Sequence, residues 1–503
     1  MIIKEPINSN QLPEYHEGQL IVKMRPVARA MGILTENVRS SSVLTTSGMS
    51  ALSFFENAGL IKRVIPLATP AMPEDLPVGI MSFGESRSPT SILAASAQPL
   101  NVDDPNAGVS ILELQRDTDV SDLQIALAQD PNVESVSRVP VRYLAAPGRK
   151  QTAKKGDYKN TDKVKAEDKT GEIGIAAVPP PASTMWNLNK ILWQQSRTLP
   201  NFRDANDIKV AVLDTGIEPT HPDLVGRVAR YLFNYTEIPS VSGNLDLIGH
   251  GTHVAGTIAA IFGNNFGING ICNCQIHAYK IFDDEPDADT FNNRFIYYVN
   301  PAMYIRALGE CVQQRVDVVN LSIGGRGTPS GQERILFNTL LANGTTVIAA
   351  MGNERQLGNP TSYPAAIPGV IAVGATNIDD TVANFSNRGN HISISAPGVG
   401  IWSTLPTYPG QFGFAGVIGA DGRLTIGAPR RRETNYDAWD GTSMASPHVA
   451  AAAALLLANK GAMSPATVRD RLMQAADRVA GMGGLNHHPD FGAGRLNLLR
   501  LLQ

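Results

Sequence analysis

The sequence predicts an α/β protein built on a doubly wound, mostly parallel sheet with helices on both faces, plus a small α+β domain at the N-terminus. Short, continuous apolar runs alternate with helical segments after residue 185, which is typical of a parallel sheet covered on both sides. Several of these runs end in residues capable of chemistry, as expected at the carboxyl ends of such strands. A lysine- and proline-rich stretch separates this region from the first part of the chain.

The N-terminal domain is predicted over residues 16–145, after a leader at 1–15. Strands are predicted for GQLIVKMR (18–25) and GVSILELQR (108–116), a helix for TTSGMSALSFFENAGL (45–60), and a helix followed by a strand for 119–144. A stretch rich in proline and serine, about residues 68–106, interrupts this domain as an insertion.

Residues 146–184 carry many lysines, three consecutive prolines and hardly any aliphatic side chains. Such a composition does not form a packed core, so we expect a flexible linker. Its basic residues could instead bind an acidic surface, although a mobile tether is the simpler interpretation. The second folded domain is then predicted over residues 185–503.

Composition excludes several classes of partner. The net charge of −3, from 43 basic and 46 acidic residues among 503, provides no global field for nucleic acid or anionic lipid. No run approaches the roughly 20 apolar residues of a membrane span, and the chain does not open like a signal peptide. As written it is therefore expected inside a cell, and secreted only if an export signal is missing from it. Cys272, Cys274 and Cys311 are interpreted as buried thiols.

The strands of the second domain bring candidate catalytic groups to one sheet edge. They are predicted at 208–214, 316–325, 345–353, 369–376 and 392–398. Asp214 ends the first of them, and Asn353 ends VIAAMGN. A helix follows from GHGTHVAGTIAAIF (249–262), with His250 and His253 three residues apart and so near one face.

A second apolar helix begins at DGTSMASPHVAAAAALLL, residues 440–457. The simplest role for Ser443 there is a helix N-cap. Hydrolysis by a serine needs a nucleophile, a base, a carboxylate that orients the base, and donors for the oxyanion. Ser443, His250, Asp214 and Asn353 can supply these in turn. No G-x-S-x-G motif surrounds Ser443, which excludes the nucleophile elbow of the α/β-hydrolases.

Seven motifs in order resemble the successive signatures of the subtilisin-like serine proteases: VAVLDTGIEPTHPDL, GHGTHVAGTIAA, VVNLSIGG, VIAAMGNE, SYPAAIPGVIAVGAT, SAPGVGIWST and GTSMASPHVAAAAALL. The likeness extends from about residue 186 to the C-terminus, and the order Asp, His, Ser is that of subtilisin. It implies Asp214 as orienting carboxylate, His250 as general base and Ser443 as nucleophile. Asn353 and the Ser443 backbone N–H would then be the oxyanion donors.

The resemblance also implies a substrate-binding edge strand, to which an extended protein or peptide adds through main-chain hydrogen bonds. Its residues are Leu321, Ser322, Ile323, Gly324 and Gly325. Gly324, Gly352 and Ser362 would wall the S1 pocket, with Glu354 beside it and no demand for a basic P1 residue. Tyr363-Pro364 stands where the family often has a cis peptide; the alternative is an ordinary trans bond.

Some families of this type bind calcium near the loop after the histidine helix. Asp223 with Asn264 or Asn265 would provide oxygen ligands for a structural calcium ion. An ordinary Asn/Gly turn is the alternative interpretation. The chemistry itself requires no cofactor.

The N-terminal domain resembles the propeptide of secreted subtilisins, notably in DPNVESV. By that resemblance it assists folding, and its tail, VPVRYLAAPG (139–148), then lies in the active-site cleft as an intramolecular inhibitor. The bond just before Pro147 is a poor candidate for cleavage, because proline lacks an N–H. We therefore expect self-cleavage after Leu144, with Val141 in the S4 pocket, or else after Ala145. The alternative is a permanently attached regulatory or binding module.

Two insertions depart from the family pattern. Residues 407–439 alternate like a β-hairpin around GADGR, and would either fold over the cleft, with residues 430–432 exposed, or lie at the periphery. Residues 283–295 are acidic and are interpreted as a surface loop.

Three rival functions share parts of this pattern. A metallohydrolase could use His221, Asp223, His250 and His253, but it leaves GTSMASPHVA and MGN without a role. A peptide-binding protein of protease fold, inhibited by its own N-terminal domain, would be expected to lack a triad member, and none is missing. A peptide ligase or macrocyclase would use the same acyl-enzyme, so sequence does not separate it from a hydrolase.

Overall fold

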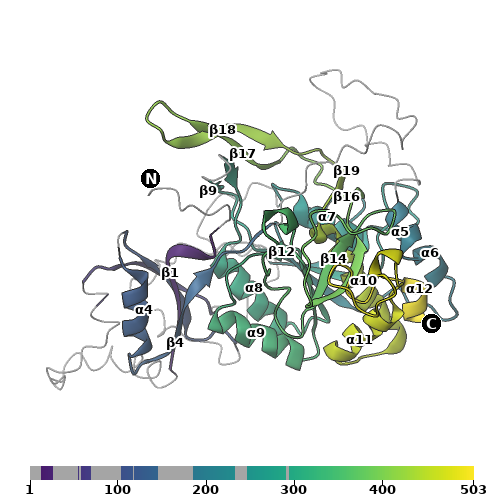
Figure 1. The fold of residues 1–503 in the computed structure, drawn as a ribbon, viewed down its shortest axis with the longest axis horizontal. Coiled ribbons are helices and arrows are strands. Elements are labelled where there is room, and N and C mark those ends of the chain that lie inside the picture. The colour runs from purple at the N-terminus through teal and green to yellow at the C-terminus, as the bar shows by residue number, and fades with distance from the viewer. Residues whose placement is uncertain are drawn as a thin grey trace, which may run out of the picture.

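The computed structural model describes residues 13–25, 55, 58–68, 104–116, 118–144, 185–232, 246–289 and 294–503 (Figure 1). The predicted linker at 146–184, nearly all of the leader and almost all of the insertion at 68–106 lie outside the described residues. So does most of the helix predicted at 45–60.

The described residues of the second domain contain a parallel sheet of seven strands, as predicted. Its order is β15 (Ile392–Pro397), β14 (Ile371–Thr376), β13 (Thr346–Ala350), β11 (Val318–Leu321), β6 (Lys209–Asp214), β8 (Gln275–Lys280) and β7 (Val228–Leu232). The chain passes from β6 to the edge strand β7, returns to β8 beside β6, and then continues on the other side of β6 from β11, so the winding reverses there. Open α/β sheets bind ligands at such a reversal.

Helices cover both faces of this sheet because every central strand is apolar on both sides. In β6, Val210 and Val212 face one core and Ala211 and Leu213 the other. The first core packs against α7 (His250–Ala259) and α10 (Thr442–Lys460), joined by α5 (Trp186–Lys190), α6 (Trp193–Ser196), α11 (Pro465–Ala475) and α12 (Leu498–Leu502). The second core packs against α8 (Pro301–Gln313) and α9 (Gly331–Ala342).

The described residues of the N-terminal domain form a four-stranded antiparallel sheet that packs against α4 (Val120–Ala128). The strand order is β2 (Ile61–Pro66), β3 (Val109–Leu114), β1 (Tyr15–Met24) and β4 (Val133–Pro140). Because side chains alternate along a strand, Leu20 and Leu112 pack towards α4. Ile21 and Ile111 point the other way and share the core of α8 and α9. The two domains are therefore joined by continuous apolar packing. Figure 1 shows the N-terminal sheet next to α8 and α9.

The two insertions of the second domain pair with each other. The hairpin predicted around GADGR forms β17 (Gln411–Ile418) and β18 (Leu424–Arg431), and it projects at the top of Figure 1. β17 pairs with β10 (Arg294–Ile296), which pairs with β9 (Asp287–Asp289). The interpretation of 283–295 as a surface loop was therefore wrong, because this segment forms β9 and β10, and β10 pairs with the hairpin. The alternative in which the hairpin folds over the cleft had residues 430–432 exposed, whereas Arg432 is buried.

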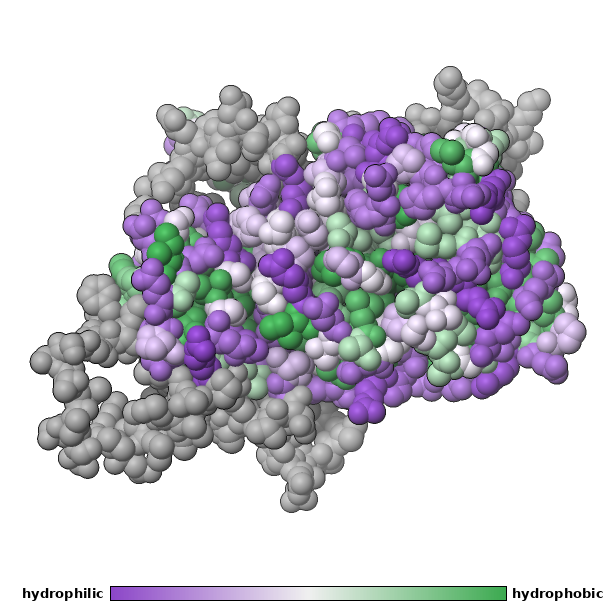
Figure 2. Space-filling model, turned by 60° about the horizontal axis from the view of Figure 1, so that its bottom comes forward, coloured by the Kyte–Doolittle hydropathy of each residue, from purple (hydrophilic) through white to green (hydrophobic). Residues whose placement is uncertain are grey.

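The remaining strands are short. β16 (Ile401–Thr404) pairs with β19 (Tyr436–Trp439), and β12 (Ile323–Gly324) pairs with β5 (Tyr143–Leu144). The three cysteines are free and buried, as predicted. No single helix among the described residues is long and apolar enough to cross a bilayer, and α10 and α11 qualify only as a pair bent by 106°. The face in Figure 2 is largely hydrophilic, with small hydrophobic patches between hydrophilic side chains.

Candidate active site

Asp214 and His250 form a buried hydrogen-bonded pair. Asp214 is the last residue of β6 and His250 the first of α7, and each side chain is 1% exposed. The His250 Nδ1 atom lies 2.7 Å from Asp214 Oδ1, which also accepts the N–H of Thr215 at 2.8 Å. Gly251 allows this approach, because a Cβ there would stand 2.0 Å from the Gly216 carbonyl oxygen.

Asp246 fixes the start of the histidine helix. One carboxylate oxygen accepts the N–H of Gly249 at 2.8 Å and the hydroxyl of Thr215 at 2.7 Å. The other accepts the N–H and hydroxyl of Thr252 at 2.9 and 2.6 Å. This carboxylate satisfies free amides at the N-terminus of α7, where a negative charge is also favoured by the helix dipole. Asp246 therefore sets the position of His250, a role that sequence reasoning missed.

The other ring nitrogen of His250 is left free. Among the described residues, the buried Nε2 atom has no hydrogen-bond partner. Ser443 lies in the first turn of α10, which packs against α7. Its hydroxyl donates to the carbonyl of Ser322 at 2.9 Å, and the Ser322 hydroxyl donates to the Ser443 carbonyl at 3.0 Å. These two hydrogen bonds hold Ser443 beside Ser322, and neither of them uses His250 Nε2.

Asn353 is oriented by the residue before Ser443. Its Oδ1 atom accepts the N–H and hydroxyl of Thr442 at 2.9 and 2.8 Å. The buried Nδ2 atom has no partner among the described residues. A Cβ built on Gly441 would stand 3.3 Å from Asn353 Nδ2 and 3.5 Å from Ser443 N. The amide nitrogens of Asn353 and Ser443 therefore both lie close to one point beside Gly441.

His253, three residues after His250, has a structural environment. Its Nε2 atom lies 3.0 Å from the Ile401 carbonyl oxygen, and its ring stacks on Trp439 with centroids 4.8 Å apart. Burial lowers the pKa of His253 to about 3. His221 is engaged in turn by the Asp223 N–H at 3.1 Å. Within the described ranges no group of three or more His, Cys, Asp or Glu side chains is arranged to hold a metal ion, so the geometry does not favour the metallohydrolase reading.

The tail of the N-terminal domain lies along the predicted substrate strand. Tyr143 pairs with Gly324 and Leu144 with Ile323 in antiparallel register. On its other side the tail pairs with residues 298–299, where the Val299 N–H donates to the Arg142 carbonyl at 2.9 Å. Gly325 allows the tail to lie this close to the predicted substrate strand, because a Cβ on Gly325 would stand 2.2 Å from the Val141 carbonyl oxygen. The tail is therefore the middle strand of three.

Of the residues predicted to wall the S1 pocket, Gly324 lies beside Ser362, and Gly352 lies beside Glu354. The Ser362 hydroxyl would be 2.7 Å from a Cβ on Gly324, and it accepts the Gly325 N–H at 3.3 Å. A Cβ on Gly352 would stand 2.7 Å from the Glu354 carboxylate. Burial raises the pKa of Glu354, whose carboxylate is hydrogen-bonded by Tyr143 of the tail. The Tyr363-Pro364 bond is cis, as the resemblance predicted.

The predicted calcium ligands are already paired with protein donors. Asp223 accepts hydrogen bonds from Asn264 Nδ2 at 2.7 Å, the Ile268 N–H at 2.9 Å and the Tyr436 hydroxyl at 3.0 Å. Asn264 Oδ1 accepts the Phe266 N–H at 3.0 Å, and Asn265 has a φ of 56°. Donors would have to leave before a cation could bind these oxygens. The arrangement fits the Asn/Gly turn and does not fit calcium.

The comparisons with known proteins agree with this geometry. A model described as the subtilase family matches residues 205–494, more than half of the chain. The chain belongs to the subtilase family. Subtilisin E from Bacillus subtilis (strain 168) is 35% identical over 274 residues, which cover 54% of this subtilase chain and 61% of that relative. Thermitase from Thermoactinomyces vulgaris is 31% identical over 306 residues, 60% of this chain and 91% of that relative.

A solved structure extends the likeness of this subtilase to nearly its whole length. Fervidolysin from Fervidobacterium pennivorans, described as a keratinolytic enzyme related to subtilisin, has a TM-score of 0.59 and 23% sequence identity. The match covers 97% of this chain and 61% of fervidolysin. It shows a shared fold. This subtilase thus spans about three fifths of fervidolysin and of several of its curated relatives.

Sequence reasoning missed residues whose role in this subtilase depends on tertiary contacts. Thr442, which orients Asn353, belongs to a quoted motif but had no assigned task. Tyr298 and Val299, on the far side of the tail, follow an insertion and carry no motif. Glu333 follows Ser330 in the spacing of a capping box, which signals only a helix start.

Proposed function

We propose that this subtilase is a serine endopeptidase in which Ser443, His250 and Asp214 form the catalytic triad. The supporting observation is the Asp214–His250 pair. Asp214 contacts Nδ1 of His250, and the buried Nε2, which must take the serine proton, has no partner among the described residues. The carboxylate holds Nδ1 as the protonated nitrogen, so Nε2 is the basic one. Ser443, in the first turn of a packed helix, supplies the nucleophile.

The reaction follows from these positions. His250 Nε2 takes the hydroxyl proton as Ser443 Oγ bonds to the carbonyl carbon of the substrate, whose C=O pair moves onto oxygen. Asn353 Nδ2 and the Ser443 N–H donate hydrogen bonds to this oxyanion. These bonds lower the barrier because they are stronger to the oxyanion than to the carbonyl oxygen of the bound substrate. The C–N bond then breaks, and the nitrogen takes the proton from His250. A water molecule then gives a proton to His250 as its oxygen bonds to the ester carbon. The bond from this carbon to Ser443 Oγ breaks, and Ser443 takes the proton back from His250.

The substrate is proposed to be a protein or peptide bound in extended form. The tail of the N-terminal domain supports this, because its main chain pairs with β12 on one side and with residues 298–299 on the other. Main-chain pairing of this kind recognises any extended chain, while side-chain pockets add selectivity. The N-terminal domain is then an intramolecular inhibitor that holds the cleft closed to other chains.

Self-processing is proposed after Leu144 or Ala145. The tail runs from Tyr143, opposite Gly324, to Leu144, opposite Ile323, and so heads towards Ser322. The Ser322 carbonyl is the group that Ser443 Oγ contacts. A bond at or just beyond Leu144 is therefore the part of the tail nearest the nucleophile. Ala145 lies outside the described residues.

Incubation with a reduced, alkylated protein, followed by mass spectrometry of the products, tests the endopeptidase activity. The wild type is expected to generate new termini, and Ser443→Ala is expected to generate none. Binding of the substrate without any new termini would instead support a peptide-binding protein. Products joined end to end in the presence of a peptide amine would support a ligase.

A further inference from the structure

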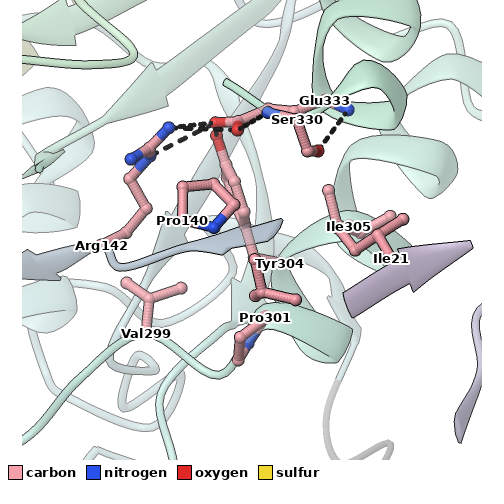
Figure 3. A pocket seen from close by; sticks show the side chains of 10 residues that line it. Ile21, Pro140, Arg142, Val299, Pro301, Tyr304, Ile305, Ser330 and Glu333 are labelled. Carbon is pink, nitrogen blue, oxygen red and sulfur yellow. Dashed lines mark hydrogen bonds and ion pairs between the residues drawn. The ribbon is translucent and has the colours of Figure 1, made fainter. Parts of the chain in front are cut away.

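Arg142 of the tail is a fully buried cation. Its side chain is 1% exposed and forms an ion pair with Glu333, which is equally buried. The Nη2 atom lies 3.0 and 3.1 Å from the two carboxylate oxygens, and Nε lies 3.3 Å from Oε1. The Nη1 atom donates to the Gly327 carbonyl at 2.8 Å. Figure 3 shows the guanidinium facing the carboxylate across this pocket.

The pocket around this pair belongs mainly to the second domain. Val299 and Pro301 lie at the start of α8, Tyr304 and Ile305 within it, and Ser330 and Glu333 at the start of α9 (Figure 3). Its other lining residues come from the N-terminal domain and its tail. The acidic group therefore remains in the second domain when the tail departs.

Glu333 is fixed independently of Arg142. The Tyr304 hydroxyl donates to Oε1 at 3.1 Å, and the Ser330 N–H donates to Oε2 at 3.3 Å. The Ser330 hydroxyl accepts the Glu333 N–H at 3.1 Å, which completes a capping box at α9. These contacts orient the carboxylate towards the pocket before any cation enters.

The main chain that carries Arg142 is paired as a substrate is proposed to be. Its carbonyl accepts the Val299 N–H, and the next residue pairs with Gly324. We expected Val141 to fill a pocket of the cleft, whereas Arg142 is the residue that enters this one. A substrate chain in the same register would place its corresponding side chain beside Glu333.

We propose that Glu333 makes this pocket a specificity site for arginine at the third or fourth residue before the bond that is cleaved. This inference rests on the proposed endopeptidase function and names its substrate class. A buried carboxylate is costly without a cation, so an apolar side chain would leave it unpaired. Arginine should be preferred over lysine at this position. The forked guanidinium pairs with both carboxylate oxygens of Glu333, and a further N–H reaches the Gly327 carbonyl.

The test uses internally quenched peptides that carry residues 139–148 of the chain, with arginine, lysine or leucine at the position of Arg142. Processed wild-type enzyme is expected to cleave the arginine peptide with kcat/KM about 10- to 100-fold above the leucine peptide. The lysine peptide should fall between them. Equal rates for all three would overturn the specificity, although the endopeptidase function would stand.

The matched variant is Glu333→Gln, which keeps a capping residue at this helix position. It should remove most of the preference for arginine, chiefly by lowering kcat/KM for the arginine peptide. Glu310→Gln removes another buried carboxylate of the same region, paired with Arg230 outside the cleft, and should keep the preference. A preference unchanged in Glu333→Gln would show that this ion pair only tethers the domains. If wild type hydrolyses none of these peptides and no unfolded protein, the endopeptidase function fails as well.

Discussion

Ser443 Oγ donates its hydrogen bond to the carbonyl oxygen of Ser322, 2.9 Å away, while His250 Nε2 has no partner among the described residues. Ser322 directly precedes the strand that pairs with the tail, so its carbonyl is the next main-chain acceptor along that edge. In the proposed mechanism the Ser443 hydroxyl turns from this carbonyl to His250 Nε2.

Asn353→Leu is predicted to slow the chemical step and to leave binding nearly unchanged. The amide Nδ2 has no partner in the resting structure and would be used only when the oxyanion forms. Loss of one such donor lowers kcat by about 10²- to 10³-fold. Steady-state kinetics on a peptide substrate should show this loss with KM within a few fold of wild type. A change confined to KM would contradict the role of Asn353 as oxyanion donor.

Arg432→Gln is predicted to destabilise the protein. The buried guanidinium donates to the carbonyls of Leu247, Pro406, Glu433 and Asp246 at 3.0 to 3.3 Å. Removing these bonds should lower the free energy of unfolding by roughly 2–4 kcal/mol. Urea unfolding in a Ser443→Ala background, which prevents self-digestion, measures the loss. The exposed neighbour Arg431→Gln is the control and should change stability by less than about 0.5 kcal/mol.

Ile111→Lys is predicted to release the N-terminal domain after processing. Ile111 is 1% exposed and packs in the core that includes α8 and α9. A lysine there buries a charge and loses apolar contact, so the affinity between the fragments should fall about 100-fold or more. Size-exclusion chromatography should show the two fragments together in wild type and apart in the variant. Ile125→Lys, on the 59% exposed Ile125, should leave them together.

His448 is predicted to make stability fall in mild acid. Its Nδ1 atom lies 2.8 Å from the Met444 carbonyl oxygen and its Nε2 lies 2.9 Å from Asn187 Nδ2, an arrangement that suits the neutral ring. Burial lowers the pKa of His448 from 6.5 to about 4. Between these two values the unfolded chain binds a proton that the folded chain does not. The stability is therefore complete above about pH 6.5 and declines towards pH 4, by up to about 1.4 kcal/mol per pH unit.

Urea unfolding between pH 4.5 and 7.5, in the Ser443→Ala background, measures this dependence. His448→Gln should be less stable at pH 7.5. Its stability should also decline less steeply towards acid, because the variant lacks the imidazole that binds this proton in the unfolded chain. His253, whose pKa burial lowers to about 3, keeps its own contribution in both proteins. Parallel curves for the two proteins would contradict the assignment to His448.

The parallel sheet and the candidate catalytic residues could be predicted because each depends on a local pattern. The apolar run at 208–214 ends in Asp214, and the structure places that residue at the end of β6 beside His250. A strand was predicted at 18–25, and β1 covers Tyr15–Met24, so it begins three residues earlier than expected. These features need only side-chain periodicity and the position of a polar residue at a strand end.

Long-range pairing could not be predicted from the same patterns. In the acidic insertion at 283–295, β9 pairs with β10, and β10 pairs in turn with a hairpin more than a hundred residues later. Arg432 is buried because four carbonyls from three loops converge on it. Arg142 and Glu333, which lie 191 residues apart, meet only once the tail has docked.

Intact-mass analysis of freshly purified wild type beside Ser443→Ala tests the central claim most directly. Wild type is predicted to lose a fragment that ends at Leu144 or Ala145, while Ser443→Ala keeps all 503 residues. This result would show that Ser443 acts on the chain docked in its own cleft. Two full-length proteins, with a wild type that also leaves an unfolded protein intact, would contradict the claim.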